Sequence, residues 1–131
     1  PHLGADKDGQ LNPIFLYDYP PSQASLANVY QNEGGIKVAQ RFELYIRGLE
    51  LANGYYELTD EAEHRRRFKE DNDAREEQSL PMIPVDQNFL AALEVGLPNC
   101  SGVALGLDRL LMVKENAKTI ADVLAFPIDR A

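Results

Sequence analysis

The sequence has little of three things: cysteine, long apolar runs and positive charge. A single cysteine, Cys100, excludes a disulfide within the chain and fits a reducing cytosol. No apolar run approaches the roughly 20 residues that a membrane-spanning helix needs, and residues 1–12 hold no apolar stretch typical of a signal sequence. Lys plus Arg number 13 against 21 Asp plus Glu, a net charge of −8. This charge argues against broad binding of a nucleic-acid backbone but leaves open a local basic or metal-bearing site.

The rest of the composition is that of an ordinary globular domain. The 131 residues are 44% hydrophobic and 26% charged, which suits one folded domain. Apolar residues that alternate with polar ones predict strands, and apolar residues three or four apart predict helices. The expected strands span residues 13–19, 38–47, 49–58 and 100–105, and the expected helices span 59–79, 86–96, 107–116 and 119–124. We therefore expect an α+β fold, with an antiparallel sheet flanked by helices, after a flexible lead-in at residues 1–12.

Some of these elements carry more specific expectations. Arg47 and Gly48 separate the second and third strands and should form the turn of a hairpin. The strand at 100–105 is short and apolar, so we expect it to be buried. Leu110 and Leu111 are expected to face inward from the helix that follows it.

The helix expected at residues 59–79 is almost entirely polar. Asp60 with Glu63 has the spacing of a capping box, and five pairs of opposite charge stand four residues apart along the helix. These pairs are Glu61–Arg65, Glu63–Arg67, Arg66–Glu70, Lys69–Asp73 and Asp71–Arg75. We expect a solvated helix held mainly by Phe68, with the three arginines at 65–67 forming a solvated face rather than an RNA-binding patch. His64 has no ligand-like spacing, and no role is assigned to it.

Carboxylates recur along the two central strands and suggest a binding site. With the turn at residues 47–48, Tyr45 faces Glu50 across the hairpin. Glu43 is then the diagonal neighbour of Glu50 on the same face, about 7–8 Å away at the backbone. Two such carboxylates suit Mg²⁺, which prefers oxygen ligands and usually also holds substrate phosphates. The alternative is that both are solvated carboxylates of an exposed strand face.

In the expected strand at residues 49–58, the candidate site residues do not all fall on one face. Asn53, Tyr55 and Glu57 share one face of a regular strand, whereas Glu50 belongs to the other. All four can face one pocket only if the strand kinks, and residues 52–54 predict a β-bulge there because they include a glycine. An amide and a carboxylate on one face suit a zwitterion. The alternative is a hydrogen-bonded structural pair.

Residues 101–109 are expected to pass from a strand into a helix. Gly102 and Gly106 allow close approach of the backbone. Arg109 falls in the first helical turn, where free amides and the helix dipole favour an anion, and its guanidinium can bind a phosphate through two hydrogen bonds. Taken alone, this pattern is a weak signal.

Three longer stretches together resemble class II lysyl-tRNA synthetases. Residues 42–60 (FELYIRGLELANGYYELTD) are similar to the two strands that precede motif 3, and residues 86–98 (DQNFLAALEVGLP) to the helix that follows them. Residues 102–109 (GVALGLDR) resemble motif 3 itself. The resemblance implies that residues 13–131 form the C-terminal half of a class II synthetase catalytic domain, including motif 3.

Other stretches are more similar to truncated paralogues of these synthetases, which lack the anticodon-binding domain. They are residues 21–27 (PSQASLA), 98–104 (PNCSGVA) and 125–131 (AFPIDRA). Lysyl-tRNA synthetases usually have glycine at the position of Ala104. The paralogues activate (R)-β-lysine with ATP and attach it to a lysine of elongation factor P.

The resemblance implies a phosphate end of the site. Glu43 and Glu50 match residues that hold Mg²⁺ together with the ATP phosphates. Arg109 matches the motif 3 arginine that binds the ATP phosphates, and it is our candidate catalytic residue.

The resemblance also implies an amino-acid end. Asn53 matches a contact to the amino-acid carboxylate, and Glu57 matches the carboxylate that receives the lysine ammonium group. Tyr55 lines the same pocket and Ala104 lies on its floor, where one extra methyl group would bias the choice between α- and β-lysine.

These likenesses imply an ATP- and Mg²⁺-dependent ligase that forms an aminoacyl adenylate and transfers the amino acid to elongation factor P. We expect it in the bacterial cytoplasm, not at a membrane, with tRNA an unexpected partner and a homodimer possible for the longer protein. Nothing like motifs 1 and 2 is present, so we expect a fragment that is inactive alone. Two alternatives remain open: a segment of a lysyl-tRNA synthetase that charges tRNA, and a non-catalytic paralogue that binds amino acids.

Overall fold

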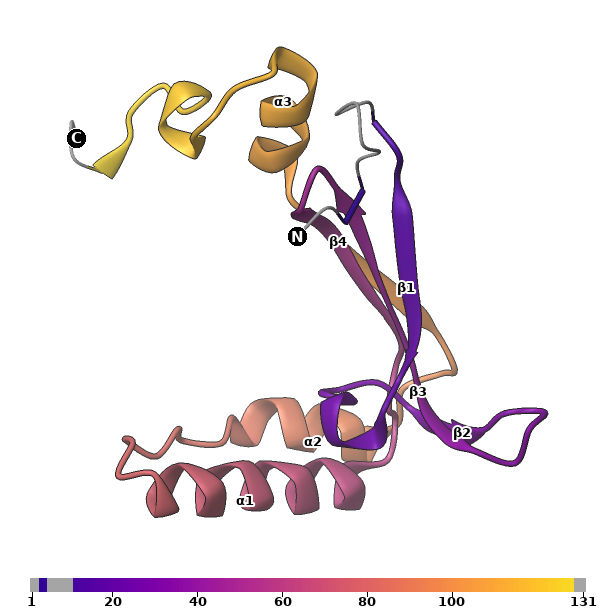
Figure 1. Cartoon of the computed structure of the whole chain (residues 1–131). Helices are drawn as coiled ribbons and strands as arrows, with labels where there is room; N and C mark the ends of the chain where they lie inside the picture. Colours follow the sequence, from indigo (N-terminus) through magenta and orange to yellow (C-terminus); the bar gives the residue numbers. More distant parts are fainter. Residues whose placement is uncertain (1–2, 5–10, 129–131) are drawn as a thin grey trace.

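An antiparallel sheet forms the centre of the molecule, in a computed structural model that describes residues 3–4 and 11–128. Its strands are β1 (Ile14–Tyr19), β2 (Val29–Gln31), β3 (Lys37–Ile46), β4 (Leu49–Tyr56) and β5 (Ser101–Leu105). The strands β1, β3, β4 and β5 lie side by side in that order, and β2 pairs with the start of β3 (Figure 1). The sequence predicted the α+β fold and the long strands, but it did not predict β2. That strand has three residues and is therefore too short to show an alternating pattern.

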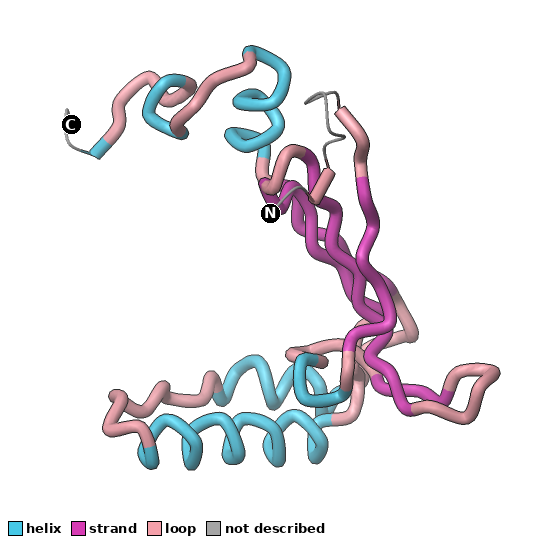
Figure 2. The backbone as a smooth tube through the Cα atoms, in the orientation of Figure 1, coloured by secondary structure: helices cyan, strands magenta, loops and turns pink. Residues whose placement is uncertain are grey.

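The helices extend from both ends of the sheet (Figure 2). At one end α1 (Glu61–Glu77) packs beside α2 (Gln87–Val95), and at the other end α3 (Leu107–Glu115) follows β5 and leads to a 3₁₀ turn at Ile120–Asp122. We call α1 with α2 one arm of the molecule, and α3 with the 3₁₀ turn the other. The two arms and the sheet give the chain an open C shape in this view (Figure 1). Among the described residues, no helix is long and apolar enough to cross a membrane. The expected lead-in at residues 1–12 lies mostly outside the described residues.

The hairpin between β3 and β4 turns where the sequence predicted. Arg47 and Gly48 have φ angles of 51° and 76°, and a two-residue hairpin with both central residues in the left-handed region is of type I′. Gly48 adopts this conformation without strain, whereas Arg47 does so at some cost. The turn sets the register, in which Ile46 pairs with Leu49 and Tyr45 with Glu50.

A β-bulge interrupts the same pair of strands. Leu44 pairs with Ala52 while the next residue, Tyr45, pairs with Glu50, so Leu51 is the extra residue in β4. The predicted kink is confirmed, but it lies one residue before the expected segment 52–54. An extra residue reverses the alternation of side chains. Glu50 therefore lies on the same face of the sheet as Asn53 and Tyr55, which follow the bulge in β4.

The polar helix α1 is held by more than the sequence predicted. Asp60 caps it by accepting a hydrogen bond from the Glu63 amide at 3.0 Å. Four of the five predicted ion pairs form: Glu61–Arg65, Glu63–Arg67, Arg66–Glu70 and Lys69–Asp73. Arg75, from the fifth, donates instead to the Pro81 carbonyl at 2.7 Å.

His64 corrects the expectation that Phe68 is the main apolar anchor of this helix. Its side chain is 1% exposed, and its Nε2 lies 2.8 Å from the Leu58 carbonyl oxygen. The ring packs edge-on against Phe89 of α2, with the centroids 5.2 Å apart, and also contacts Phe68. His64 thus joins the end of the sheet to both helices.

Two expectations about burial are wrong. The strand β5 was expected to be buried, yet Val103 is 64% exposed and Leu105 46% exposed. Leu110 and Leu111 were expected to face inward, but in α3 the buried residue is Met112. The physical reason is that the side chains of a strand stand perpendicular to the sheet, and no other described element covers the face of β5 that carries Val103 and Leu105. Much of α3 is likewise not covered by any other part of the described chain.

Candidate active site

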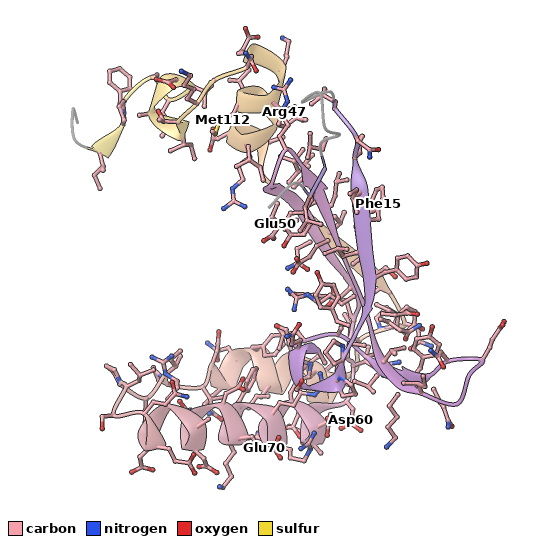
Figure 3. The ribbon with its side chains drawn as sticks, viewed as in Figure 1. Phe15, Arg47, Glu50, Asp60, Glu70 and Met112 are labelled. Atoms are coloured by element: carbon pink, nitrogen blue, oxygen red, sulfur yellow. The ribbon has the colours of Figure 1, made fainter. Side chains whose placement is uncertain are left out.

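One face of the sheet gathers most of the side chains that the sequence singled out. Cross-strand partners point to the same side of a sheet, and the register aligns Arg41, Tyr55 and Gly102 in one row and Glu43, Asn53 and Ala104 in the next. Tyr45 and Glu50 form a third row. We call these eight residues, together with Glu57, the site face. Figure 3 shows Glu50 on the side of the sheet between the two arms, while Phe15 points to the opposite side.

The first turn of α3 brings Arg109 to this face. The Gly106 amide donates to the Leu51 carbonyl at 2.8 Å, so the start of α3 is fixed to the bulge in β4. Arg109 Nη1 donates to the carbonyl of Glu50, also at 2.8 Å. The guanidinium is exposed and keeps further donors for a ligand. The structure thus brings Arg109 to the backbone of Glu50.

Glu43 is the most deeply buried carboxylate of the site face, at 5% exposure. Arg41 donates to its Oε1, and the Tyr45 hydroxyl donates to its Oε2 at 2.6 Å. Burial alone would raise the pKa of Glu43, but hydrogen bonds from Tyr45 and Tyr19 and the Arg41 guanidinium outweigh burial and lower the pKa below its ordinary value. The same hydrogen bond to Glu43, with burial, raises the pKa of Tyr45 to about 12. Glu43 is therefore ionised and firmly oriented.

The sequence did not identify Arg41 as a site residue. Its guanidinium lies over the Tyr19 ring, 4.6 Å from the centroid, and 5.8 Å from the centroid of Tyr55. Its Nη1 donates to the Gln23 carbonyl at 2.8 Å. Arg41 stands two residues before Glu43 on the same strand face, and this spacing was the available signal. Arg41 ties together Glu43 and Tyr55, two of the predicted ligand-binding residues.

Asn53 and Glu57 form the other end of the site face. Asn53 Oδ1 is buried, and no hydrogen-bond partner for it lies among the described residues. A buried acceptor without a partner costs free energy, so this amide fits a position where a ligand supplies the missing bond. Glu57 follows β4, and its amide donates to the Cys100 carbonyl at 3.0 Å. This bond holds Glu57 beside the start of β5.

The carboxylates fit Mg²⁺ in part. Within residues 3–4 and 11–128, no three His, Cys, Asp or Glu side chains converge as a metal site. Magnesium, however, is commonly held by one or two carboxylates together with substrate phosphates. Glu50 fits this role because it lies beside Arg109 at the face. Glu43 has about four acceptor positions and already takes hydrogen bonds from Arg41, Tyr45 and Tyr19, so it has little capacity left for a metal ion.

A model of the class II tRNA synthetase family (D, K and N) matches residues 4–130. The chain belongs to this family. The match includes the whole sheet, all three helices and the site face.

Curated relatives add a more specific likeness. The chain is 50% identical over 131 residues to the elongation factor P–(R)-β-lysine ligase of Hamiltonella defensa subsp. Acyrthosiphon pisum. It is 52% identical to proteins of the same name from Salmonella dublin and Salmonella enteritidis. Each match covers 100% of this chain but 38% of the relative. The chain therefore spans less than half the length of these proteins.

Proposed function

We propose that this chain works as part of a longer polypeptide of its relatives' size, here called the full-length protein. The full-length protein activates (R)-β-lysine with ATP as an adenylate and transfers it to a lysine side chain of elongation factor P. The observation that carries this proposal is the convergence of Glu50, Asn53, Tyr55, Glu57 and Arg109 at one face. The names of the relatives support the choice of amino acid and acceptor.

In the first step, the carboxylate of the amino acid attacks the α-phosphorus of ATP, and pyrophosphate leaves. Arg109 neutralises phosphate charge from the first turn of α3, where the helix dipole adds to its effect. Mg²⁺, which ligases of this class generally use, would neutralise further phosphate charge when held by Glu50. Glu43, already engaged by Arg41 and Tyr45, would orient its neighbours on the site face. The backbone bond from Arg109 to Glu50 keeps the arginine in place without using all of its donors.

The amino acid is held by the other end of the site face. The carboxylate of Glu57 receives the side-chain ammonium group, and the amide of Asn53 contacts the polar groups at the reacting end. Tyr55 lines the space between them, fixed from one side by Arg41. Orientation of the two substrates supplies much of the rate enhancement in such a reaction.

In the second step, the ε-amine of the acceptor lysine attacks the carbonyl of the adenylate and releases AMP. This transfer needs no covalent enzyme nucleophile. Cys100, the single cysteine, is half-buried beside the site and has no part in the mechanism.

Replacement of Glu57 by Gln tests the proposal. The neutral amide cannot form the ion pair with the substrate ammonium group, and a charge-assisted hydrogen bond is worth about 1.5–3 kcal/mol. We expect the KM for (R)-β-lysine in ATP–pyrophosphate exchange to rise about 10- to 100-fold, with the KM for ATP little changed. Glu77→Gln at the exposed end of α1 is the control. An unchanged KM for the amino acid in Glu57→Gln would contradict the assigned role.

The family also includes enzymes that charge tRNA, so the same full-length protein should be offered tRNA. Transfer of lysine to tRNA at a rate comparable with transfer to elongation factor P would favour the synthetase alternative. Binding of lysine and ATP without pyrophosphate exchange would favour a non-catalytic paralogue.

A further inference from the structure

Gly102 on β5 has no side chain, and the carboxylate of Glu57 occupies the space that a side chain would fill. A Cβ atom added at Gly102 would lie 2.5 Å from Glu57 Oε1. This separation is well below the van der Waals distance, so the two atoms cannot coexist at their present positions. The carboxylate of Glu57 therefore rests directly on the backbone of β5 at the one point where that strand presents no side chain to it.

The neighbouring strand β5 fixes the backbone of Glu57. Gly102 on β5 pairs with Tyr55 on β4, and Tyr55 in turn pairs with Arg41 on β3. The Glu57 amide is held by the Cys100 carbonyl, two residues before Gly102. The backbone of Glu57 is thus fixed to β5, and the gap above Gly102 receives the end of its side chain.

We propose that Gly102 is a positioning residue that sets how deeply the Glu57 carboxylate sits, and thereby sets the affinity for the terminal ammonium group of the substrate. The inference rests on the proposed function for the identity of that ammonium group. It concerns the depth of the carboxylate above the sheet. Glu57 makes the contact to the substrate, and Gly102 acts through it.

The chemistry of the site makes Gly102→Ala an informative change. Its φ lies outside the left-handed region, so alanine fits the backbone. Apart from Oε1, the only described atom within 4 Å of the added Cβ is Glu57 Cδ, at 3.6 Å. Both atoms belong to the outer part of a flexible side chain, which can move at little cost to the fold. At Gly54, by contrast, a Cβ would lie 2.4 Å from the Phe42 ring and would disturb packing.

The experiment measures ATP–pyrophosphate exchange by the full-length protein with (R)-β-lysine. For Gly102→Ala we expect the KM for the amino acid to rise about 10-fold or more, because the ion pair to the ammonium group is lost or lengthened. The KM for ATP should change little, since the phosphate end is untouched. The control is Gly34→Ala in the β2–β3 turn, where a Cβ would meet one atom at 3.4 Å.

A double variant separates positioning from general damage. Shortening Glu57 to Asp withdraws the carboxylate from the added methyl group. Glu57→Asp and Gly102→Ala should therefore be less than additive in their effect on the KM for the amino acid. Additive effects, or an unchanged KM in Gly102→Ala, would overturn the inference while leaving the proposed function intact.

A crystal structure of the Gly102→Ala full-length protein gives a readout that does not depend on activity. We expect the Glu57 carboxylate to be displaced from the backbone of β5 while the sheet keeps its register. A carboxylate at its original position would overturn the inference. If the unmodified protein shows no exchange with any lysine isomer, the proposed function fails, and this structure alone decides the positioning role.

Discussion

At the scale of the residue, we propose that small differences along β5 shape the floor of the site. Gly102 and Ala104 both face the site, beside Tyr55 and Asn53 respectively. Neither residue contributes a functional group, so each acts by the space that it leaves. Gly102 leaves room for the carboxylate of Glu57, and we propose that the methyl group of Ala104 removes room beside the polar end of the substrate.

Replacement of Ala104 by Gly should shift the preference of the full-length protein from (R)-β-lysine toward α-lysine. Removal of the methyl group widens the floor next to Asn53, and a difference of this size is worth about 1–3 kcal/mol. The measurement is kcat/KM for each isomer in ATP–pyrophosphate exchange. Ala91→Gly, an exposed position in the middle of α2, is a control for the loss of a methyl group. An unchanged ratio between the isomers would contradict the assigned place of Ala104.

The carboxylate of Glu43 is oriented by its neighbours. It accepts hydrogen bonds from Arg41, Tyr45 and Tyr19. The hydrogen bond to Glu43, together with burial, raises the pKa of Tyr45 to about 12. Burial, together with hydrogen bonding to Glu43, also raises the pKa of Tyr19. Both phenols therefore stay protonated and continue to donate at neutral pH. These hydrogen bonds orient Glu43 in the middle of the site face.

At the scale of the element, the bulge in β4 is the feature on which the site depends. A regular strand would turn Glu50 away from Asn53, Tyr55 and Glu57. The extra residue at Leu51 turns it back, and its carbonyl also accepts the bond from Gly106 that fixes the start of α3. One irregularity thus places a carboxylate and the motif 3 helix together.

The sequence predicted this arrangement to a considerable extent, because local signals determine it. The Arg47-Gly48 turn fixes the register of the hairpin, and the parity of Glu50 against Asn53 demands a bulge. His64 could not be foreseen, since its burial depends on α2 packing over α1. The exposure of Val103 and Leu105 could not be foreseen either, because an apolar strand alone does not show which of its faces will be covered.

The ion pairs of α1 predict a dependence on pH. Hydrogen bonds from Arg66, and then from Arg67, lower the pKa of Glu63 to about 2, although burial opposes them. A lowered pKa stabilises the fold above the ordinary value of 4.5, and this contribution is lost as the pH falls toward about 2. Glu63→Gln should therefore cost the full-length protein up to about 1 kcal/mol at pH 7 and progressively less below pH 4.5.

Urea unfolding at pH 7 and at pH 2–3 measures this difference. Glu76→Gln, an exposed residue near the end of the same helix, should change the stability little at either pH. A difference between the Glu63 variant and the unmodified protein that persists at low pH would show that the ion pairs are not its source.

At the scale of the whole molecule, the two faces of the sheet differ. One is the site face, and the other carries exposed apolar side chains. The side opposite the site face carries Phe15, Tyr17, Val103 and Leu105, which are 46–72% exposed. Large apolar side chains that gather on one exposed face are typical of a surface that another segment or partner covers. The chain covers 38% of its relatives' length, and we propose that the remaining length of the full-length protein covers this face.

We predict that the 131-residue chain alone is inactive. The site face carries Glu50, Asn53 and Glu57, and α3 carries Arg109, but the resemblance places further ATP and substrate contacts in motifs outside this sequence. ATP–pyrophosphate exchange by the isolated chain, with α-lysine or (R)-β-lysine, should not exceed the background without enzyme. The full-length protein serves as the positive control. Robust turnover by the isolated chain would contradict the proposal that it holds part of an active site.

We propose above that the full-length protein attaches (R)-β-lysine to elongation factor P. Mass spectrometry of elongation factor P, after incubation with the full-length protein, ATP and each lysine isomer in turn, tests this claim most directly. We predict an increase in mass equal to one lysyl residue, largest with (R)-β-lysine and absent when ATP is omitted. No increase in mass with any isomer would contradict the claim.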